Sequence, residues 1–240
     1  MRPVVRGAHP ESLVMVEYRH ARPTLLERMG GYCSFCEVQA PTLDVEHIRC
    51  KDHNPALALE WSNFLLACKN CNSTKGTTVS TDEDVAARLW PDRDRTQDAF
   101  VYGEGGVVSV APLVDPAERR KAELTAEMVG LLRRPGAGLT SGQTRTASDR
   151  RLHLRRQAWD EATISRNNLR KAPVEEMRDQ ILILATARGF FSVWLTVFRD
   201  DADMVDRLIR AFSGTDRARI LTPTPTAPPP PQAPPTPPPA

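Results

Sequence analysis

The chain has 240 residues, of which 32 are lysine or arginine and 30 are aspartate or glutamate. This near balance excludes a uniformly basic nucleic-acid-binding protein, although a local basic patch is compatible with it. The hydrophobic content of 40% is that of a folded protein, and the length predicts one or two domains. The sequence has neither an uncharged apolar stretch long enough to span a membrane nor a signal-peptide core, so we expect a cytoplasmic protein without membrane contact.

The first half of the chain carries one short helix signal and one strand signal. A helix is expected over residues 24–29, with Thr24 as its N-cap, Glu27 as the capping-box acid, and Gly30 as its end. Residues 43–48 (LDVEHI) alternate in the manner of a strand.

The second half predicts a hairpin followed by helices. Residues 100–102 and 107–110 flank a glycine-rich loop, which is typical of a β-hairpin. Asp115 and Pro116 then open a helix that we expect to reach about Arg134. Residues 136–148 are expected to be a loop, and further helices are expected over residues 149–171, 174–198 and 203–212.

Aromatic and proline residues mark two further features. Phe190, Trp194 and Phe198 recur at helical spacing, which favours a core stripe over a partner surface. Eleven of the 21 prolines fall within residues 222–240 and predict a disordered, extended tail. That tail is either a spacer or a ligand for a proline-reading partner.

Two Cys-x2-Cys pairs, separated by 31 residues, carry the strongest chemical signal. Two such knuckles form a closed site of four thiolates, which is the geometry of structural zinc. The expected zinc ligands are Cys33, Cys36, Cys68 and Cys71. The alternative is four unrelated buried thiols. Cys50 lies outside both knuckles and is expected to be a small buried or free thiol.

A closed zinc site has no open position for catalysis, so the chemistry must come from residues between and after the knuckles. Glu46 and His47 are neighbours, and a regular strand would point them to opposite faces. A site that uses both therefore needs a strand end or a bulge.

The full pattern resembles a known family. Cys-x2-Cys, Glu-His-Ile and then Asn-Phe-Leu-Leu-Ala-Cys-x2-Cys-Asn-x2-Lys-Gly occur in the order of HNH endonucleases of the zinc-knuckle ββα-metal type, in a His-Asn-Asn variant. The resemblance covers about 45 residues, 32–76. The chain is also similar, over fewer residues, to HNH proteins of bacterial anti-phage systems such as Septu and of retron-associated cassettes.

The resemblance implies a role for each matching residue. Glu46 and Asn72 would bind the catalytic metal, Mg²⁺ or Mn²⁺, and His47 would be the general base that activates water. Asn63 would hold the loop that carries the base. Lys75 would lie near phosphate.

The sequence departs from the family pattern at Cys50, where many relatives have proline. This change leaves the path of the neighbouring loop open, and we expect Arg49 to contact phosphate.

Residues 145–171 carry eight arginines and lysines against three acids. Arg151, Arg155 and Arg156 are expected to follow phosphates of a nucleic acid. The alternative is an ordinary solvated helix face.

These signals together predict an α+β chain. Its expected parts are an N-terminal extension (1–23), a zinc-stabilised ββα-metal nuclease module (24–90), a hairpin with a helical region (91–221), and the proline-rich tail (222–240). The expected function is metal-dependent cleavage of DNA, with RNA left open, as the nuclease of an anti-phage system that an ATPase partner controls. The alternative is a non-catalytic zinc module that binds nucleic acid or protein.

Overall fold

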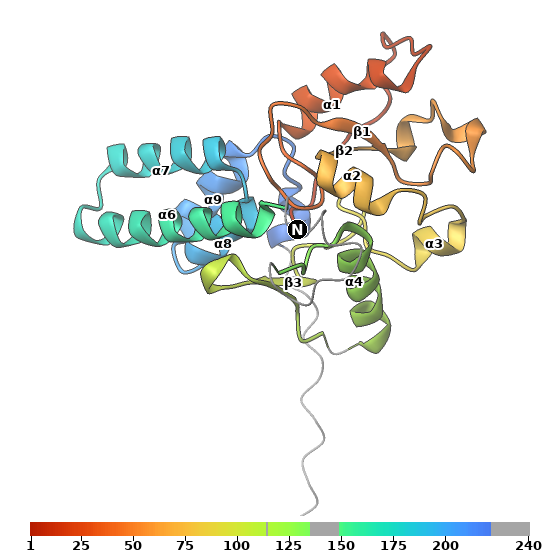
Figure 1. Ribbon diagram of the computed structural model, residues 1–240. Helices are drawn as coiled ribbons and strands as arrows, with labels where there is room; N and C mark the ends of the chain where they lie inside the picture. Colours follow the sequence, from red (N-terminus) through yellow and green to blue (C-terminus); the bar gives the residue numbers. More distant parts are fainter. Residues whose placement is uncertain (114, 135–148, 222–240) are drawn as a thin grey trace, which may run out of the picture.

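The computed structural model describes residues 1–113, 115–134 and 149–221. The expected loop over residues 136–148 and the proline-rich tail lie outside these residues. The described chain is α+β, with helices around two small antiparallel sheets, as predicted (Figure 1).

The first half of the chain contains a ββα unit. Helix α1 (Arg22–Met29) precedes strand β1 (Asp44–His47), which pairs with β2 (Phe64–Ala67). The register joins Asp44 to Ala67 and His47 to Phe64. Helix α2 (Lys69–Lys75) follows β2 after one residue. Short 3-10 helices lie around the unit at Tyr18–Ala21 (η1), Pro55–Leu57 (η2) and Trp61–Asn63 (η3), and α3 (Asp82–Ala86) follows it.

The rest of the chain combines a hairpin with a group of helices. Strands β3 (Phe100–Tyr102) and β4 (Val108–Val110) form the predicted hairpin around η4 (Glu104–Gly106). The helices are α4 (Pro116–Val129), α6 (Arg151–Lys171), α7 (Glu175–Arg188), α8 (Phe191–Val197), α9 (Ala202–Ala211) and α10 (Arg217–Leu221). Figure 1 shows α6, α7, α8 and α9 grouped to one side of the ββα unit.

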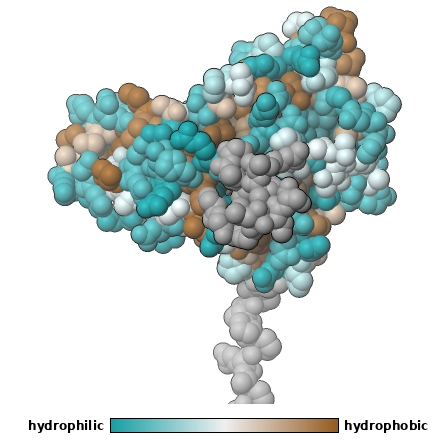
Figure 2. Space-filling view, in the orientation of Figure 1, coloured by the Kyte–Doolittle hydropathy of each residue, from teal (hydrophilic) through white to brown (hydrophobic). Residues whose placement is uncertain are grey.

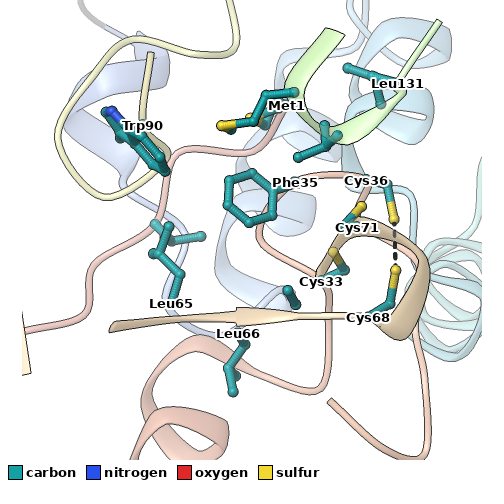
Figure 3. Packing of buried hydrophobic residues seen from close by; sticks show 14 of the residues in the cluster. Met1, Cys33, Phe35, Cys36, Leu65, Leu66, Cys68, Cys71, Trp90 and Leu131 are labelled. Atoms are coloured by element: carbon teal, nitrogen blue, oxygen red, sulfur yellow. Dashed lines mark hydrogen bonds between the residues drawn. The ribbon is translucent and has the colours of Figure 1, made fainter. Parts of the chain in front are cut away.

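The hydrophobic core extends across the predicted parts of the chain. One cluster includes Met1 and Val4 from the expected extension, Phe35 from the expected module, and Ala158 from α6. Figure 3 shows Phe35 between Trp90 and the four cysteines, with Met1 beside Phe35. The division at residues 23 and 90 therefore stays a prediction, because the packing itself has no break there.

The first helix differs from its prediction at its start. It begins at Arg22, and its N-cap residue Ala21 makes no side-chain cap. Thr24 and Glu27 are thus inside the helix, and the predicted capping box is wrong. Pro23 lies in the first turn, where its fixed φ favours the helix and its missing N–H costs nothing. The helix ends at Gly30, as predicted, with φ of 77°.

Two later helices end earlier than the sequence predicts. Asp115 caps α4 as expected, accepting from the Ala117 N–H at 2.8 Å, but Gly130 adopts the left-handed conformation and ends the helix well before Arg134. The single helix predicted over residues 174–198 is two helices, since Gly189 and Phe190 both have positive φ between α7 and α8. Phe190, Trp194 and Phe198 are all buried, which confirms the core stripe.

The distribution of polar residues on the surface agrees with the composition of a folded protein. On the face drawn in Figure 2, hydrophilic residues predominate and hydrophobic ones are scattered. Among the described residues, no helix has both the length and the apolar character needed to cross a bilayer.

Gly189 is the position where the fold depends on a glycine. A Cβ there would lie 2.7 Å from the Gln39 nitrogen and 2.7 Å from the Glu37 oxygen, and φ is 77°. We predict that Gly189→Ala lowers the free energy of unfolding by about 2 kcal/mol or more, through strain and backbone overlap. Gly31→Ala is the control, because a Cβ at Gly31 meets nothing within 4 Å. Equal denaturant midpoints for the two variants would contradict this view of Gly189.

Candidate functional site

The end of strand β1 brings Glu46 and His47 into one pocket. His47 is the last residue of β1, so the alternation of a regular strand does not continue beyond it. Both side chains line a pocket of 240 Å³, together with Asn72 and Lys75 from α2 and Tyr18 from η1. The sequence predicts either a strand end or a bulge here, and the structure has the strand end.

His47 is held from three directions. Its Nε2 lies 3.1 Å from the Ala58 carbonyl oxygen, and its ring makes edge-to-face contacts with Tyr18 at 4.9 Å and Phe64 at 5.2 Å. Because a carbonyl oxygen only accepts, Nε2 carries the proton in this contact and Nδ1 is the nitrogen with a free lone pair. Burial lowers the pKa of His47, which keeps the imidazole neutral at physiological pH.

Glu46 is a buried carboxylate with a buried cation beside it. It is 5% exposed, and its Oε1 lies 2.8 Å from Lys75 Nζ. Burial raises the pKa of Glu46, while Lys75 acts in the opposite direction. Lys75 is only 1% exposed and also donates to the His47 carbonyl at 2.7 Å. Lys75 thus lines the pocket with a buried amine that is paired with Glu46, and its position near phosphate stays a prediction.

Asn72 completes a set of oxygen donors at the pocket. Its side-chain Nδ2 donates to Asp44 Oδ2 at 3.3 Å, which leaves the amide oxygen available as a ligand. A carboxylate and an amide oxygen in one pocket suit a hard cation such as Mg²⁺, which keeps several waters. The residues present therefore fit the expected catalytic metal, and Glu46 and Asn72 stay its predicted ligands.

The Asn63 side chain forms three hydrogen bonds with the loop that follows His47. Its Oδ1 accepts from the Arg49 N–H at 2.8 Å, and its Nδ2 donates to the Arg49 carbonyl at 3.0 Å and to the Leu57 carbonyl at 3.3 Å. These bonds fit the loop-holding role that the resemblance implies. The Arg49 side chain lines a separate pocket of 450 Å³ and pairs with Asp82 at 2.7 Å, so its phosphate contact stays a prediction.

The two knuckles meet in a second cluster beside this pocket. All four sulfurs of Cys33, Cys36, Cys68 and Cys71 lie within 4.8 Å of one another, and all four residues are buried (Figure 3). Cys36 Sγ and Cys68 Sγ are 3.6 Å apart. A tetrahedral zinc with Zn–S bonds of about 2.3 Å separates its sulfurs by about 3.8 Å, so the cluster fits zinc. Cys50 is buried outside this cluster, as predicted, and lines the pocket of His47.

The arginines of α6 divide into buried and exposed ones. Arg151 and Arg155 are 4% and 2% exposed and donate to groups within the protein, so the prediction that they follow phosphates is wrong. Helical spacing alone could not distinguish the inner face of α6, because both faces carry arginine. Arg156 is exposed and its contact with nucleic acid stays a prediction.

The sequence did not predict Tyr18, which lines the pocket, or Asp44, which accepts a hydrogen bond from the pocket residue Asn72. Tyr18 reaches His47 from a segment read as an extension without a clear pattern, and a tyrosine there carries no signal of its own. Asp44 lies two residues before Glu46 in the strand alternation, and this spacing could have placed both carboxylates on one face.

The zinc assignment predicts a stoichiometry. Elemental analysis of the purified protein should find about one zinc per chain. Cys68→Ser should lose zinc and lower thermal stability, because structural zinc contributes folding energy. Cys50→Ser is the matched control and should keep its zinc, since Cys50 lies outside the cluster. Folded wild-type protein without zinc would refute the assignment.

Comparison with known proteins agrees with this geometry. Residues 31–78, which span both knuckles and the ββα unit, match the family model described as HNH endonuclease. Over 65 residues the chain is 38% identical to the Septu protein PtuB of Bacillus thuringiensis. This match covers 25% of the chain and 25% of that protein, so the chain spans about a quarter of its relative's length. Residues 31–78 are therefore similar to the HNH endonuclease family, and the match does not extend to the rest of the chain.

Proposed function

We propose that this protein is a metal-dependent endonuclease that cleaves DNA. The observation that carries the proposal is the convergence of Glu46, His47 and Asn72 in one pocket, where His47 Nδ1 has no hydrogen-bond partner among the described residues. A module that only binds nucleic acid or protein would need none of these three side chains in this arrangement. The non-catalytic alternative is therefore less well supported.

The reaction would divide its tasks among these residues. Hydrolysis of a phosphodiester needs an activated water and stabilisation of the charge on the phosphoryl and leaving oxygens. His47 would take a proton from water at Nδ1, while the Ala58 carbonyl and the flanking rings hold the imidazole in place. A divalent cation bound to Glu46 and Asn72 would supply the positive charge at the phosphate. Asn63 would keep the loop after the base in position.

The biological setting is part of the proposal. The relative's name, Septu protein PtuB, supports a role in anti-phage defence, as does the resemblance to HNH proteins of such systems. We propose that the chain acts there as the nuclease and that an ATPase partner controls it. Arg156, exposed on α6, is the remaining candidate of the basic segment for contact with nucleic acid.

Loss of the base provides the central test. His47→Ala should remain folded and zinc-loaded, because His47 is not a member of the cysteine cluster. It should lose about 100- to 10,000-fold of the cleavage rate on supercoiled plasmid with Mg²⁺ or Mn²⁺. The control is His153→Ala, at an exposed histidine of α6, which should cleave like the wild type. Equal rates for His47→Ala and wild type would reject His47 as the base.

The pH dependence follows from the surroundings of His47. Only the neutral ring accepts a proton, so the cleavage rate should rise with pH as the imidazolium loses its proton. Because burial lowers the pKa of His47, the midpoint of the rise should lie below its ordinary value of 6.5. Glu46, whose pKa burial raises, would add a rise in the same direction. Repeating the profile at higher Mg²⁺ identifies the Glu46 contribution, since protons and metal compete directly for a carboxylate ligand. A rate that falls between pH 5 and 7 would contradict this assignment.

A further inference from the structure

Arg151 makes an unusual set of contacts at the start of α6. Its Nη1 lies 3.1 Å from the sulfur of Cys71, one of the four clustered cysteines, and 2.9 Å from the Val129 carbonyl. Its Nη2 donates to the Gly130 carbonyl at 3.1 Å and to Asp149 at 2.6 Å. Its Nε also donates to Asp149, at 2.9 Å. Every nitrogen of the guanidinium therefore has an acceptor, in a side chain that is 4% exposed.

Burial of the Arg151 side chain at this position is unfavourable unless its hydrogen-bond acceptors compensate for the cost. Arg151 is the first residue of α6, and the N-terminus of a helix repels a cation. Removing a guanidinium from water is also unfavourable before its contacts are counted. The carbonyls of Val129 and Gly130 offset part of this cost, because they belong to the negative C-terminal end of α4.

The contact with the Cys71 sulfur gives an electrostatic reason for the burial of Arg151. A dication held by four thiolates leaves a net charge of about −2 in a buried site, and N–H donors directed at the sulfurs stabilise such a centre. Arg151 brings a positive charge directly to Cys71. Arg155, one turn later on α6, is also buried and fixed to the Gly106 carbonyl at 2.6 Å. The buried arginines thus join α6 to the cysteine cluster through Arg151 and to the β-hairpin through Arg155.

We propose that Arg151 is an outer-sphere partner of the zinc site, and that the zinc-bound Cys71 thiolate in turn anchors the start of α6 to the nuclease module. The cluster then has two functions. It holds the two knuckles together within the module, and it joins the module to the helical region that follows. The inference rests on the zinc assignment and is independent of whether the pocket at His47 cleaves nucleic acid.

The test measures zinc binding in the full chain. Zinc-loaded wild type, Arg151→Gln and Arg156→Gln are titrated against a chromogenic zinc chelator. Arg151→Gln should bind zinc about 10- to 100-fold more weakly than the wild type, which is the usual effect of removing an outer-sphere partner. Arg156→Gln is the matched control, since it removes the same charge from an exposed position on the same helix. Zinc affinity within twofold of wild type in Arg151→Gln overturns the proposal.

A second measurement addresses the anchoring of α6. In zinc-loaded Arg151→Gln, hydrogen exchange should accelerate in the first turns of α6, while the paired strands β1 and β2 keep their protection. Wild-type protection of α6 in that variant overturns the anchoring. If Arg151→Gln does not fold, Arg151→Met replaces it in both measurements. Methionine has neither the charge nor the N–H groups that contact the Cys71 sulfur, so wild-type zinc affinity in Arg151→Met also overturns the proposal.

Discussion

The meeting of four cysteine sulfurs is the constraint on which the rest of the ββα unit depends. Cys33 and Cys36 come from the loop after α1, whereas Cys68 and Cys71 flank the start of α2. Joining these cysteines fixes α2 against the loop. Because β2 leads into α2 after one residue, the small sheet is fixed as well. A two-stranded sheet with one short helix buries too little apolar surface to be stable alone, so such a cross-link supplies what the core cannot.

The pocket at His47 is built on this frame. Asn72 and Lys75 reach it because α2 starts within the cysteine cluster, and Glu46 and His47 reach it because β1 ends there. Lys75 illustrates how tightly the elements are joined, since its buried amine contacts the carboxylate of Glu46 and the backbone of His47. The candidate catalytic groups thus lie on two elements that the cysteine cluster and this ion pair hold together, while Asn63 holds the loop between them.

The regions outside the family match contribute to the same arrangement. Tyr18, from the N-terminal segment, packs on the ring of His47. Glu37, next to the first knuckle, accepts from both the backbone N–H and the hydroxyl of Ser192 at the start of α8, at 2.7 and 2.6 Å. Arg151 connects α6 to Cys71 and to the end of α4. Buried polar contacts therefore fix the helical region to the module, and each would be costly to break because its partner would remain buried and unpaired.

The sequence by itself determined the local features of this protein. The knuckle spacing, the hairpin around its glycine loop, the Asp115 cap and the aromatic core stripe all depend on residues close together in the chain, where backbone geometry leaves few alternatives. The order of Glu46, His47, Asn63 and Asn72 likewise carried the family resemblance. Only the tertiary structure decided which basic residues face inward. Arg151, Arg155 and Lys75 look like solvated cations in the sequence, yet each is buried against an acceptor from a distant segment. The reason is physical: the burial of a charge depends on partners that folding brings together, and no periodicity along the chain records them.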